Sequence, residues 1–254
     1  MYKFFKRVGL VLLVIVSFIY TEKATLVVKE YDKLMLDIKE NTSIYNKTKM
    51  ESIIKDNTII PGVTGKTVDA DKSYSNMKFN NKFDPNLISY KLDYPKIRLK
   101  DNKDKYIIKT QKEEVSLIIK INKSFNSSIL NIDDKVSFYM DNSFIKNNTL
   151  LVSDLVSKKY TILNNQNDYL KNVVGQKNTY CLAKDINDKI LSQCKSNSYT
   201  VIPNIIFSNN YFKFNKELSS GSIILTDLSN YKSVLKIVKN KGYKIVSLDE
   251  LLSE

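Results

Sequence analysis

The sequence predicts an α/β fold with parallel strands for residues 111–254. Short apolar runs alternate there with stretches of helical periodicity, which is the pattern of βαβ units. Hydrophobic residues make up 43% of the 254 residues, and only 6 Gly and 4 Pro interrupt them, so a packed core is expected. We expect two further regions before it, an apolar segment over 1–23 and a small mixed α+β domain over 24–110.

The first 23 residues have the pattern of an uncleaved signal anchor. Lys3, Lys6 and Arg7 precede an apolar run over 8–20, and a basic segment followed by such a run is typical of secretory signals. Glu22 stands where a cleavage site needs a small residue. We therefore expect one membrane segment in the bacterial cytoplasmic membrane, with its positive flank in the cytoplasm and the body of the chain on the extracytoplasmic side.

The region 24–110 mixes short strand signals with a short helix. Strands are expected around 59–60 and 106–108, and Asp69 and Asp71 are expected to cap a helix between them. The apolar spacing over 27–38 fits either a strand or a helical stalk, and both alternatives stay open.

The region 111–254 carries the strands of the α/β fold. The expected strands are 115–121, 136–140, 160–163, 179–182, 199–202, 222–225 and 244–247. A helix is expected over 185–193, and another with an apolar stripe ends at Gly242. In parallel βα barrels the chemistry lies at the carboxyl ends of the strands.

The closing segment of the chain, 221–252, carries a family resemblance. Its residues GSIIL…VLKIVKNKGYKIVSLDELL resemble the last unit of the polysaccharide deacetylase (NodB-homology) family. Val115–Ile119 and Val136–Asn142 resemble the first two strands of that family. The resemblance covers 111–254, and it implies an irregular (β/α) barrel and metal-dependent hydrolysis of the C–N bonds of N-acetyl amino sugars.

The positions that this family uses for chemistry hold other residues in this chain. Two aspartates, a general base and a metal ligand, should follow the first strand, and Lys120 and Ile121 stand there. Two metal-binding histidines should follow the third strand, and Asn164 and Asn165 stand there. The last catalytic histidine corresponds to about Asp227, and the chain contains no histidine at all. The resemblance therefore implies a degenerate member.

These replacements decide the expected function. A divalent ion that activates water is held by imidazoles and carboxylates, whereas Lys120 puts a positive charge at that place. We expect no cofactor and no metal, and a pseudoenzyme that binds or scaffolds cell-wall polysaccharide or wall-associated proteins. The alternative is an active carbohydrate deacetylase with an atypical site, so whether the chain is an enzyme stays open. Without histidine, a Ser–His–Asp or Cys–His site is excluded.

The charge of the chain bears on its partners. The formal net charge is +13, and the lysines are dispersed among Asn and Ser. This composition fits a solvated basic surface or attraction to an anionic lipid or wall polymer. Zinc-finger spacing and RNA-binding signatures are absent from the sequence, so no nucleic acid partner is expected.

One loop combines the side chains that sugar binding needs. Asn209 and Asn210 offer amide donors, and Tyr211 and Phe212 offer aromatic faces directly after a predicted strand. We take these residues as the candidate glycan contacts. Further aromatic candidates for a sugar-stacking groove are Tyr139, Phe144 and Phe214.

Cys181 and Cys194 are the two cysteines of the chain, and an extracytoplasmic location permits a disulfide between them. Two turns of an intervening helix would separate them by about 11 Å. The Cα atoms of a bridged pair lie about 4.4–6.8 Å apart. The sequence leaves both the bridged and the free state open.

Overall fold

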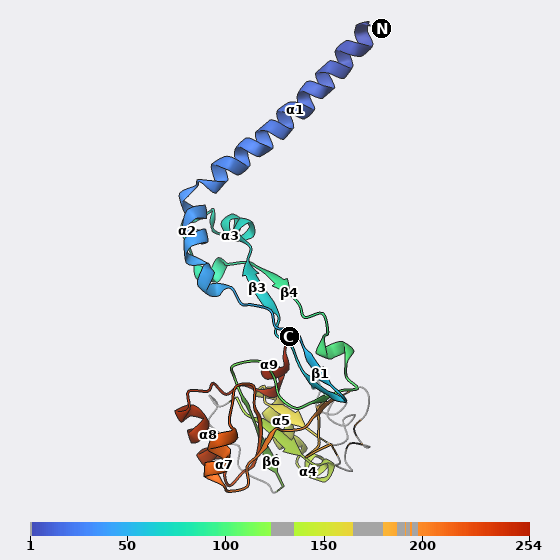
Figure 1. Cartoon of the computed structure of the whole chain (residues 1–254), viewed down its shortest axis with the longest axis vertical. Coiled ribbons are helices and arrows are strands. Elements are labelled where there is room, and N and C mark those ends of the chain that lie inside the picture. The colour runs from blue at the N-terminus through green and yellow to red at the C-terminus, as the bar shows by residue number, and fades with distance from the viewer. Residues whose placement is uncertain (1, 123–134, 165–179, 187–190, 192–193, 195–197) are drawn as a thin grey trace. The chain divides into compact units, whose positions relative to one another are not determined.

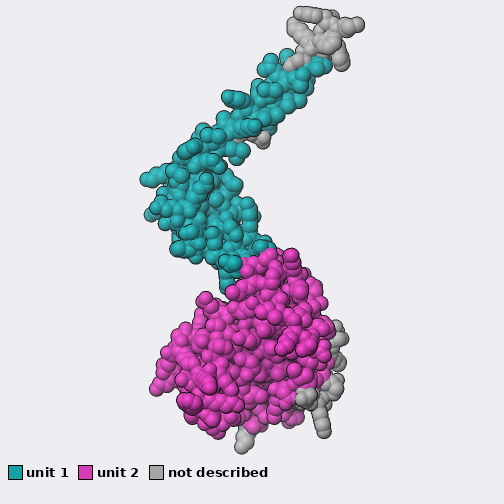
Figure 2. Space-filling model, in the orientation of Figure 1, with its two compact units in different colours: residues 1–48, 65–93 teal, residues 49–64, 94–254 magenta. Residues whose placement is uncertain are grey.

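The chain folds into two compact units, each built from two segments of the sequence (Figure 2). Unit 1 comprises Met1–Thr48 and Gly65–Asp93, and unit 2 comprises Lys49–Thr64 and Tyr94–Glu254. The computed structural model describes residues 2–122, 135–164, 180–186, 191, 194 and 198–254, and Figure 1 labels the larger of their elements.

Unit 1 begins with the long helix α1, Tyr2–Glu30. Its 29 residues span about 44 Å at 1.5 Å per residue. The part from Leu10 to Glu30 has a mean hydropathy of 2.0 and is not buried by the rest of the chain. By length and composition, the predicted apolar segment is thus a helix that is able to cross a membrane.

The rest of unit 1 is a small α+β body. It contains α2 (Lys33–Asn41), α3 (Ala70–Met77), the antiparallel strands β3 (Gly65–Val68) and β4 (Tyr90–Asp93), and the 3₁₀ turns Ser43–Tyr45 and Pro85–Leu87. Its core is formed by Leu34, Met35, Ile38, Tyr74 and Met77. The apolar residues of 33–41 thus line one side of a helix, which settles the open choice in favour of helix.

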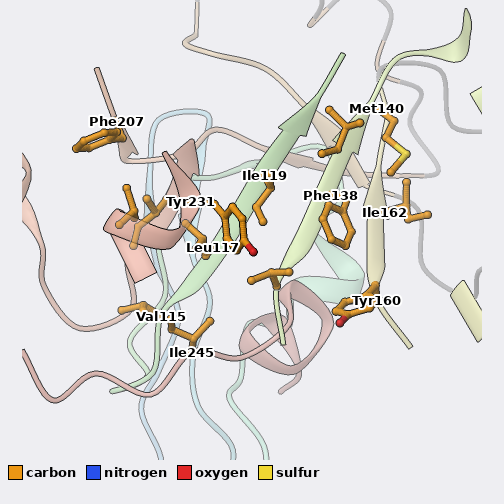
Figure 3. Packing of buried hydrophobic residues seen from close by; sticks show 14 of the residues in the cluster. Val115, Leu117, Ile119, Phe138, Met140, Tyr160, Ile162, Phe207, Tyr231 and Ile245 are labelled. Carbon is orange, nitrogen blue, oxygen red and sulfur yellow. The ribbon is translucent and has the colours of Figure 1, made fainter. Parts of the chain in front are cut away.

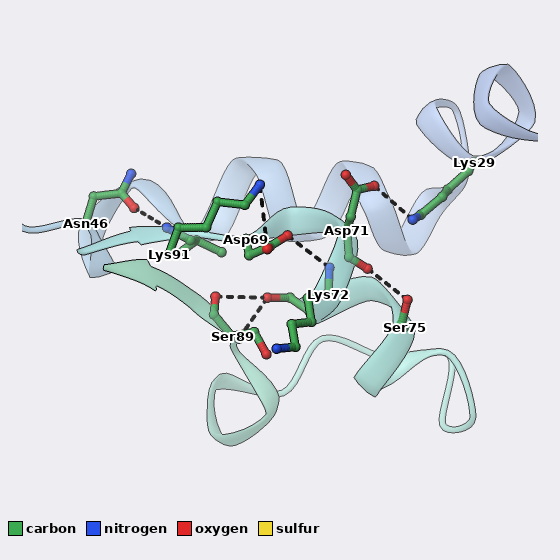
Figure 4. A network of polar contacts seen from close by, with 10 residues as sticks. Lys29, Asn46, Asp69, Asp71, Lys72, Ser75, Ser89 and Lys91 are labelled. Carbon is green, nitrogen blue, oxygen red and sulfur yellow. Dashed lines mark hydrogen bonds and ion pairs between the residues drawn. The ribbon is translucent and has the colours of Figure 1, made fainter. Parts of the chain in front are cut away.

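Charged side chains hold the helices of unit 1 in place (Figure 4). The Asp69 carboxylate accepts a hydrogen bond from the Lys72 amide at 3.1 Å, so the predicted cap of α3 is confirmed for Asp69, whereas Asp71 lies in the first turn. Lys91 pairs with the same carboxylate at 3.6 Å. Lys29, at the end of α1, pairs with Asp71 in the first turn of α3 at 2.8 Å.

Unit 2 is built on a ten-stranded sheet with the order β1-β2-β5-β10-β9-β8-β7-β6-β12-β11. All neighbours in it are parallel except β1 and β2. Its strands are β1 (Ile53–Lys55), β2 (Thr58–Ile60), β5 (Tyr106–Ile107), β6 (Ser116–Ile121), β7 (Ser137–Met140), β8 (Thr161–Leu163), β9 (Tyr180–Leu182), β10 (Tyr199–Val201), β11 (Ile205–Ile206) and β12 (Ile223–Asp227). The predicted α/β barrel is therefore confirmed as a curled, open sheet.

Helices cover the outer face of this sheet. They are α4 (Asn142–Asn147), α5 (Thr149–Ser157), α7 (Tyr211–Glu217) and α8 (Tyr231–Asn240). Alternate residues of β6, Leu117 and Ile119, pack outward with Phe138 of β7 and with Tyr231 and Val234 of α8 (Figure 3). A strand has a period of two, so the residues between them face the inside of the curl.

The inner face has its own core, and the short helix α9 (Leu248–Leu252) closes it at the amino ends of the strands. Leu248 and Leu251 pack there with Ile118, and the Leu248 amide donates to the Ser137 hydroxyl at the start of β7, at 2.9 Å. A 3₁₀ turn, Leu99–Asp101, adds Leu99 to the same core.

Two sequence predictions differ from this structure. The expected strand over 244–247 is a single parallel bridge between Ile245 and Val115, because Ser247 then caps α9 and turns the chain under the sheet. The predicted boundary at residue 110 also differs from the division into units. Ile59 of β2 and Ile107 of β5 are fully buried in the inner core, so strands expected in the small domain instead extend the large sheet.

Candidate functional site

The parallel strands of unit 2 end at a common edge, which we call the mouth of the sheet. Lys120 lies near the end of β6, between Tyr139 of β7 and Asp227 of β12 in the register of the sheet. Neighbouring strands lie about 4.8 Å apart. All three residues alternate with outward-facing neighbours, so their side chains share the inner face of the curl.

A cavity of about 260 Å³ opens at this mouth. It is lined by Lys120, Ile121, Asn122, Tyr139, Asp141, Leu182, Lys184 and Leu225. Leu182 and Leu225 are buried and form its apolar floor, whereas Lys120 and Tyr139 are half-buried along its wall. The cavity therefore combines an apolar floor with a polar rim, which is the usual composition of a small ligand site.

Asp141 is the acidic side chain of this cavity, and it is already engaged in a local structure. Its carboxylate accepts hydrogen bonds from the Phe144 amide and from the Ser143 hydroxyl, both at 2.7 Å, as the N-cap of α4. The Phe144 amide bond, followed by the Ser143 hydroxyl, holds the pKa of Asp141 below its ordinary value, and the nearby Lys120 ammonium adds a smaller effect. Asp141 therefore stays ionised as a helix cap.

The structure separates the residues that stand at the catalytic positions of the resembled family. Lys120 and Ile121 both line the cavity, although the Ile121 side chain packs in the outer core and is 2% exposed. Asn164 follows β8 and is fully buried. Asp227 ends β12 beside Lys120 but is not among the residues that line the cavity. Asn165 lies outside the described residues.

The candidate glycan contacts follow the carboxyl end of β11, which pairs with β12. Asn209 has a φ of 60°, and the Asn210 side chain accepts from the Lys213 amide as the cap of α7. The Tyr211 ring packs edge-on against Phe207, with centroids 5.1 Å apart. Phe212 is 83% exposed, so it is the member of this group with a free aromatic face.

The two cysteines are joined. Cys181 of β9 and Cys194 form a disulfide, and their Cα atoms are 5.7 Å apart. The separation expected from a helix over 185–193 does not apply, because Asp185 and Ile186 lie in a bend and a turn. The rest of that expected helix lies largely outside the described residues.

The residues at the mouth do not fit a divalent metal. Metal sites that activate water are built from imidazole and carboxylate ligands, and the chain has no histidine. Within the described parts of the chain, no three Cys, Asp or Glu side chains are grouped as metal ligands would be. The carboxylate that lines the cavity, Asp141, caps a helix, and Lys120 brings a positive charge to the same cavity.

Some cavity residues follow from the sequence and others do not. Tyr139 is a predicted aromatic candidate and lines the cavity, while the candidates Phe144 and Phe214 are buried in the outer core. Asp141 and Lys184 also line the cavity but are not among the residues predicted from the sequence. Both stand just after a predicted strand, and that position was the available signal.

Comparisons by sequence give no relative. No protein-family model matches the chain. No curated protein matches its sequence.

Comparisons with solved structures do give matches. A CE4 family pseudoenzyme from Bacillus anthracis, BA3943, has a TM-score of 0.62 and 20% identity, and the match covers 88% of this chain and 96% of that one. A mutant of BA3943, described as having restored enzymatic activity, gives the same TM-score and identity over 88% of this chain and 99% of that one. The resemblance to the polysaccharide deacetylases is thus confirmed at the level of the fold, and this chain has the fold of the CE4 family of carbohydrate esterases.

Proposed function

We propose that this protein is a membrane-anchored, extracytoplasmic member of the deacetylase-like proteins that has lost catalysis and binds or scaffolds cell-wall glycan. The observation that carries the proposal is the mouth of the sheet. A cavity is kept there, at the edge where βα folds place their ligands, but Lys120 lines it and its carboxylate Asp141 caps a helix.

The chemistry of deacetylation supports the loss of catalysis. Metal-dependent hydrolysis of an acetamide needs a divalent ion that holds and activates a water molecule. An ammonium group at Lys120 repels such an ion and supplies no hydroxide. The cavity therefore keeps the means to bind a polar ligand while lacking the groups that would activate water.

Two further observations support the proposed location. Helix α1 is long and apolar enough to serve as an anchor, and the basic residues before its apolar part favour a cytoplasmic amino end. The Cys181–Cys194 disulfide fits an oxidising compartment, where such bridges persist.

The proposal is tested on the full-length chain in detergent micelles. We expect retention on purified cell-wall polysaccharide, no acetate release from N-acetylglucosamine oligomers and no stoichiometric zinc by elemental analysis. We also expect Phe212→Ala to weaken retention, because this ring is 83% exposed on the helix that follows the carboxyl end of β11. The matched control is Phe79→Ala, since Phe79 is 97% exposed in unit 1.

The alternative function is an active carbohydrate deacetylase with an atypical site. Acetate release that persists after purification to homogeneity, or one tightly bound zinc per chain, would establish that alternative and overturn the proposal. Absence of retention on every wall polymer would overturn the binding role.

A further inference from the structure

We infer that the mouth cavity is an oxyanion site, in which Lys120 binds a carboxylate or phosphate group carried by the wall polymer. This inference deepens the proposed function and rests on it. It concerns the charge of the ligand, which the fold by itself does not indicate.

The polar groups that line the cavity are mostly hydrogen-bond donors. Lys120 and Lys184 carry ammonium groups, Asn122 carries an amide NH₂, and Tyr139 carries a hydroxyl. Ammonium groups bind carboxylates and phosphates through short charge-assisted hydrogen bonds. A ligand group with several acceptor oxygens and a negative charge therefore matches this lining best.

The carboxylate of the cavity does not cancel this preference. Asp141 accepts the hydrogen bonds from the Phe144 amide and the Ser143 hydroxyl at its Oδ1 atom, which fixes this carboxylate at the cap of α4. It is the one carboxylate among the residues that line the cavity, against the two lysines Lys120 and Lys184. None of the ion pairs between described residues includes Lys120. The half-buried ammonium is thus available to a ligand from a partly desolvated position, where its charge acts more strongly than on an open surface.

The surroundings of the cavity act in the same direction. The apolar floor of Leu182 and Leu225 lowers the local dielectric, and the formal net charge of +13 raises the concentration of anionic polymers near the protein. The Tyr139 ring stands next to Lys120 in the sheet and offers an apolar surface to the sugar that carries the anion.

The test compares Lys120→Gln, which removes the charge, with Lys120→Arg, which keeps it. The matched control is Lys236→Gln, because Lys236 is exposed on α8 and outside the cavity, and its replacement changes the net charge equally. We measure binding of the full-length chain in detergent to soluble wall polymer at several salt concentrations. Loss of one charge-assisted bond predicts about a tenfold or larger fall in affinity for Lys120→Gln. Lys120→Arg and Lys236→Gln should bind as the wild type does.

Two treatments of the polymer identify the source of the anion. If acid removal of phosphate-bearing polymers abolishes the effect of Lys120→Gln, the ligand group is a phosphate. If amidation of the carboxyl groups abolishes it, the ligand group is a carboxylate.

A polymer that binds wild type and Lys120→Gln equally would overturn the inference while leaving the glycan-binding proposal intact. Equal binding of neutral chitin oligomers, without salt dependence, would do the same. If the wild type binds no wall polymer at all, the proposed function itself fails. The thermal midpoint of each variant, measured in parallel, shows whether a loss of binding reflects unfolding.

Discussion

Replacement of Gly221 by alanine should damage the sheet at the strand that leads to the mouth. Gly221 lies just before β12 and has a φ of 73°, a conformation that costs a residue with a Cβ about 1–2 kcal/mol. A Cβ at this position would lie 1.9 Å from the Thr110 carbonyl oxygen, so the backbone must move. The Thr110 amide donates to the Gly221 carbonyl at 2.9 Å, and loss of this bond adds about 1 kcal/mol. We expect a loss of about 2–3 kcal/mol in unfolding free energy, which is the sum of these two effects.

Gly242 provides a matched control within the same unit. It follows α8 with a φ of 81°, but a Cβ there meets no atom within 4 Å. Gly242→Ala therefore carries the conformational cost alone, about 1–2 kcal/mol. The difference between the two variants isolates the effect of the close approach to Thr110, which includes the loss of its hydrogen bond to Gly221.

Urea unfolding of the full-length chain in detergent, followed by circular dichroism, gives both free energies. Hydrogen exchange measured by mass spectrometry should place the loss of Gly221→Ala in peptides from β6 and β12, because the two strands pair directly. If Gly221→Ala proves no less stable than Gly242→Ala, the close approach of Thr110 does not govern this turn and the reasoning is wrong.

Two further predictions concern the mouth. Removing the Cys181–Cys194 bridge with Cys194→Ser should lower the unfolding free energy by about 3 kcal/mol, which is the value for a disulfide that closes a loop of about 15 residues. Reductant should lower the unfolding free energy of the wild type to the same level. A wild type whose stability does not respond to reductant would contradict this prediction. Asp141→Ala should cost about 1 kcal/mol at pH 7 through loss of the α4 cap. The folded-state pKa of Asp141 is lowered, so this carboxylate stabilises the folded protein above the ordinary Asp pKa of about 3.9, and the stabilisation is lost as the pH falls through the folded-state pKa. A stability difference between Asp141→Ala and the wild type that does not change with pH would argue against the cap.

The strands of the large sheet were predictable where they are buried on both faces. Residues 116–121 and 223–227 read as apolar runs because helices cover one side and the inner core the other. The closing run over 244–247 has the same composition but pairs through one bridge at Ile245. An apolar composition indicates that a segment is buried, but it does not indicate strand pairing. Ile245 and Val246 are buried without belonging to a strand.

The extent of the sheet was not predictable from local patterns. The strand at 58–60 pairs with the strand at 106–107, which pairs with the strand at 199–201. Such long-range pairing leaves no periodic signal in either short segment. Two short segments of the region 24–110 therefore pair in the large sheet, whereas the helix that Asp69 caps lies in unit 1.

The sequence predicted the residue Lys120 of the candidate site but not which residues surround it. Lys120 stood out because a cationic residue occupies a place where the resembled family has a carboxylate. Its neighbours Tyr139 and Asp227 depend on the register of three parallel strands, which the sequence does not state. Cys181 and Cys194 show the same limit, since their pairing required the geometry of the turn after β9.

The two ends of the sheet explain how the fold persists although the residues at the catalytic positions of the resembled family differ in this chain. At the amino ends, the Asp249 carboxylate of α9 accepts hydrogen bonds from the Thr161 and Tyr180 hydroxyls, both at 2.6 Å. Leu248 and Leu251 pack beside it in the inner core. None of these five residues lines the mouth cavity. Because the stabilising contacts of α9 lie at the end of the strands opposite to the mouth, residues at the mouth are able to change without loss of the fold. Residues at the mouth, Lys120 among them, are therefore able to differ from those of the deacetylases, while the amino end keeps the framework of the fold.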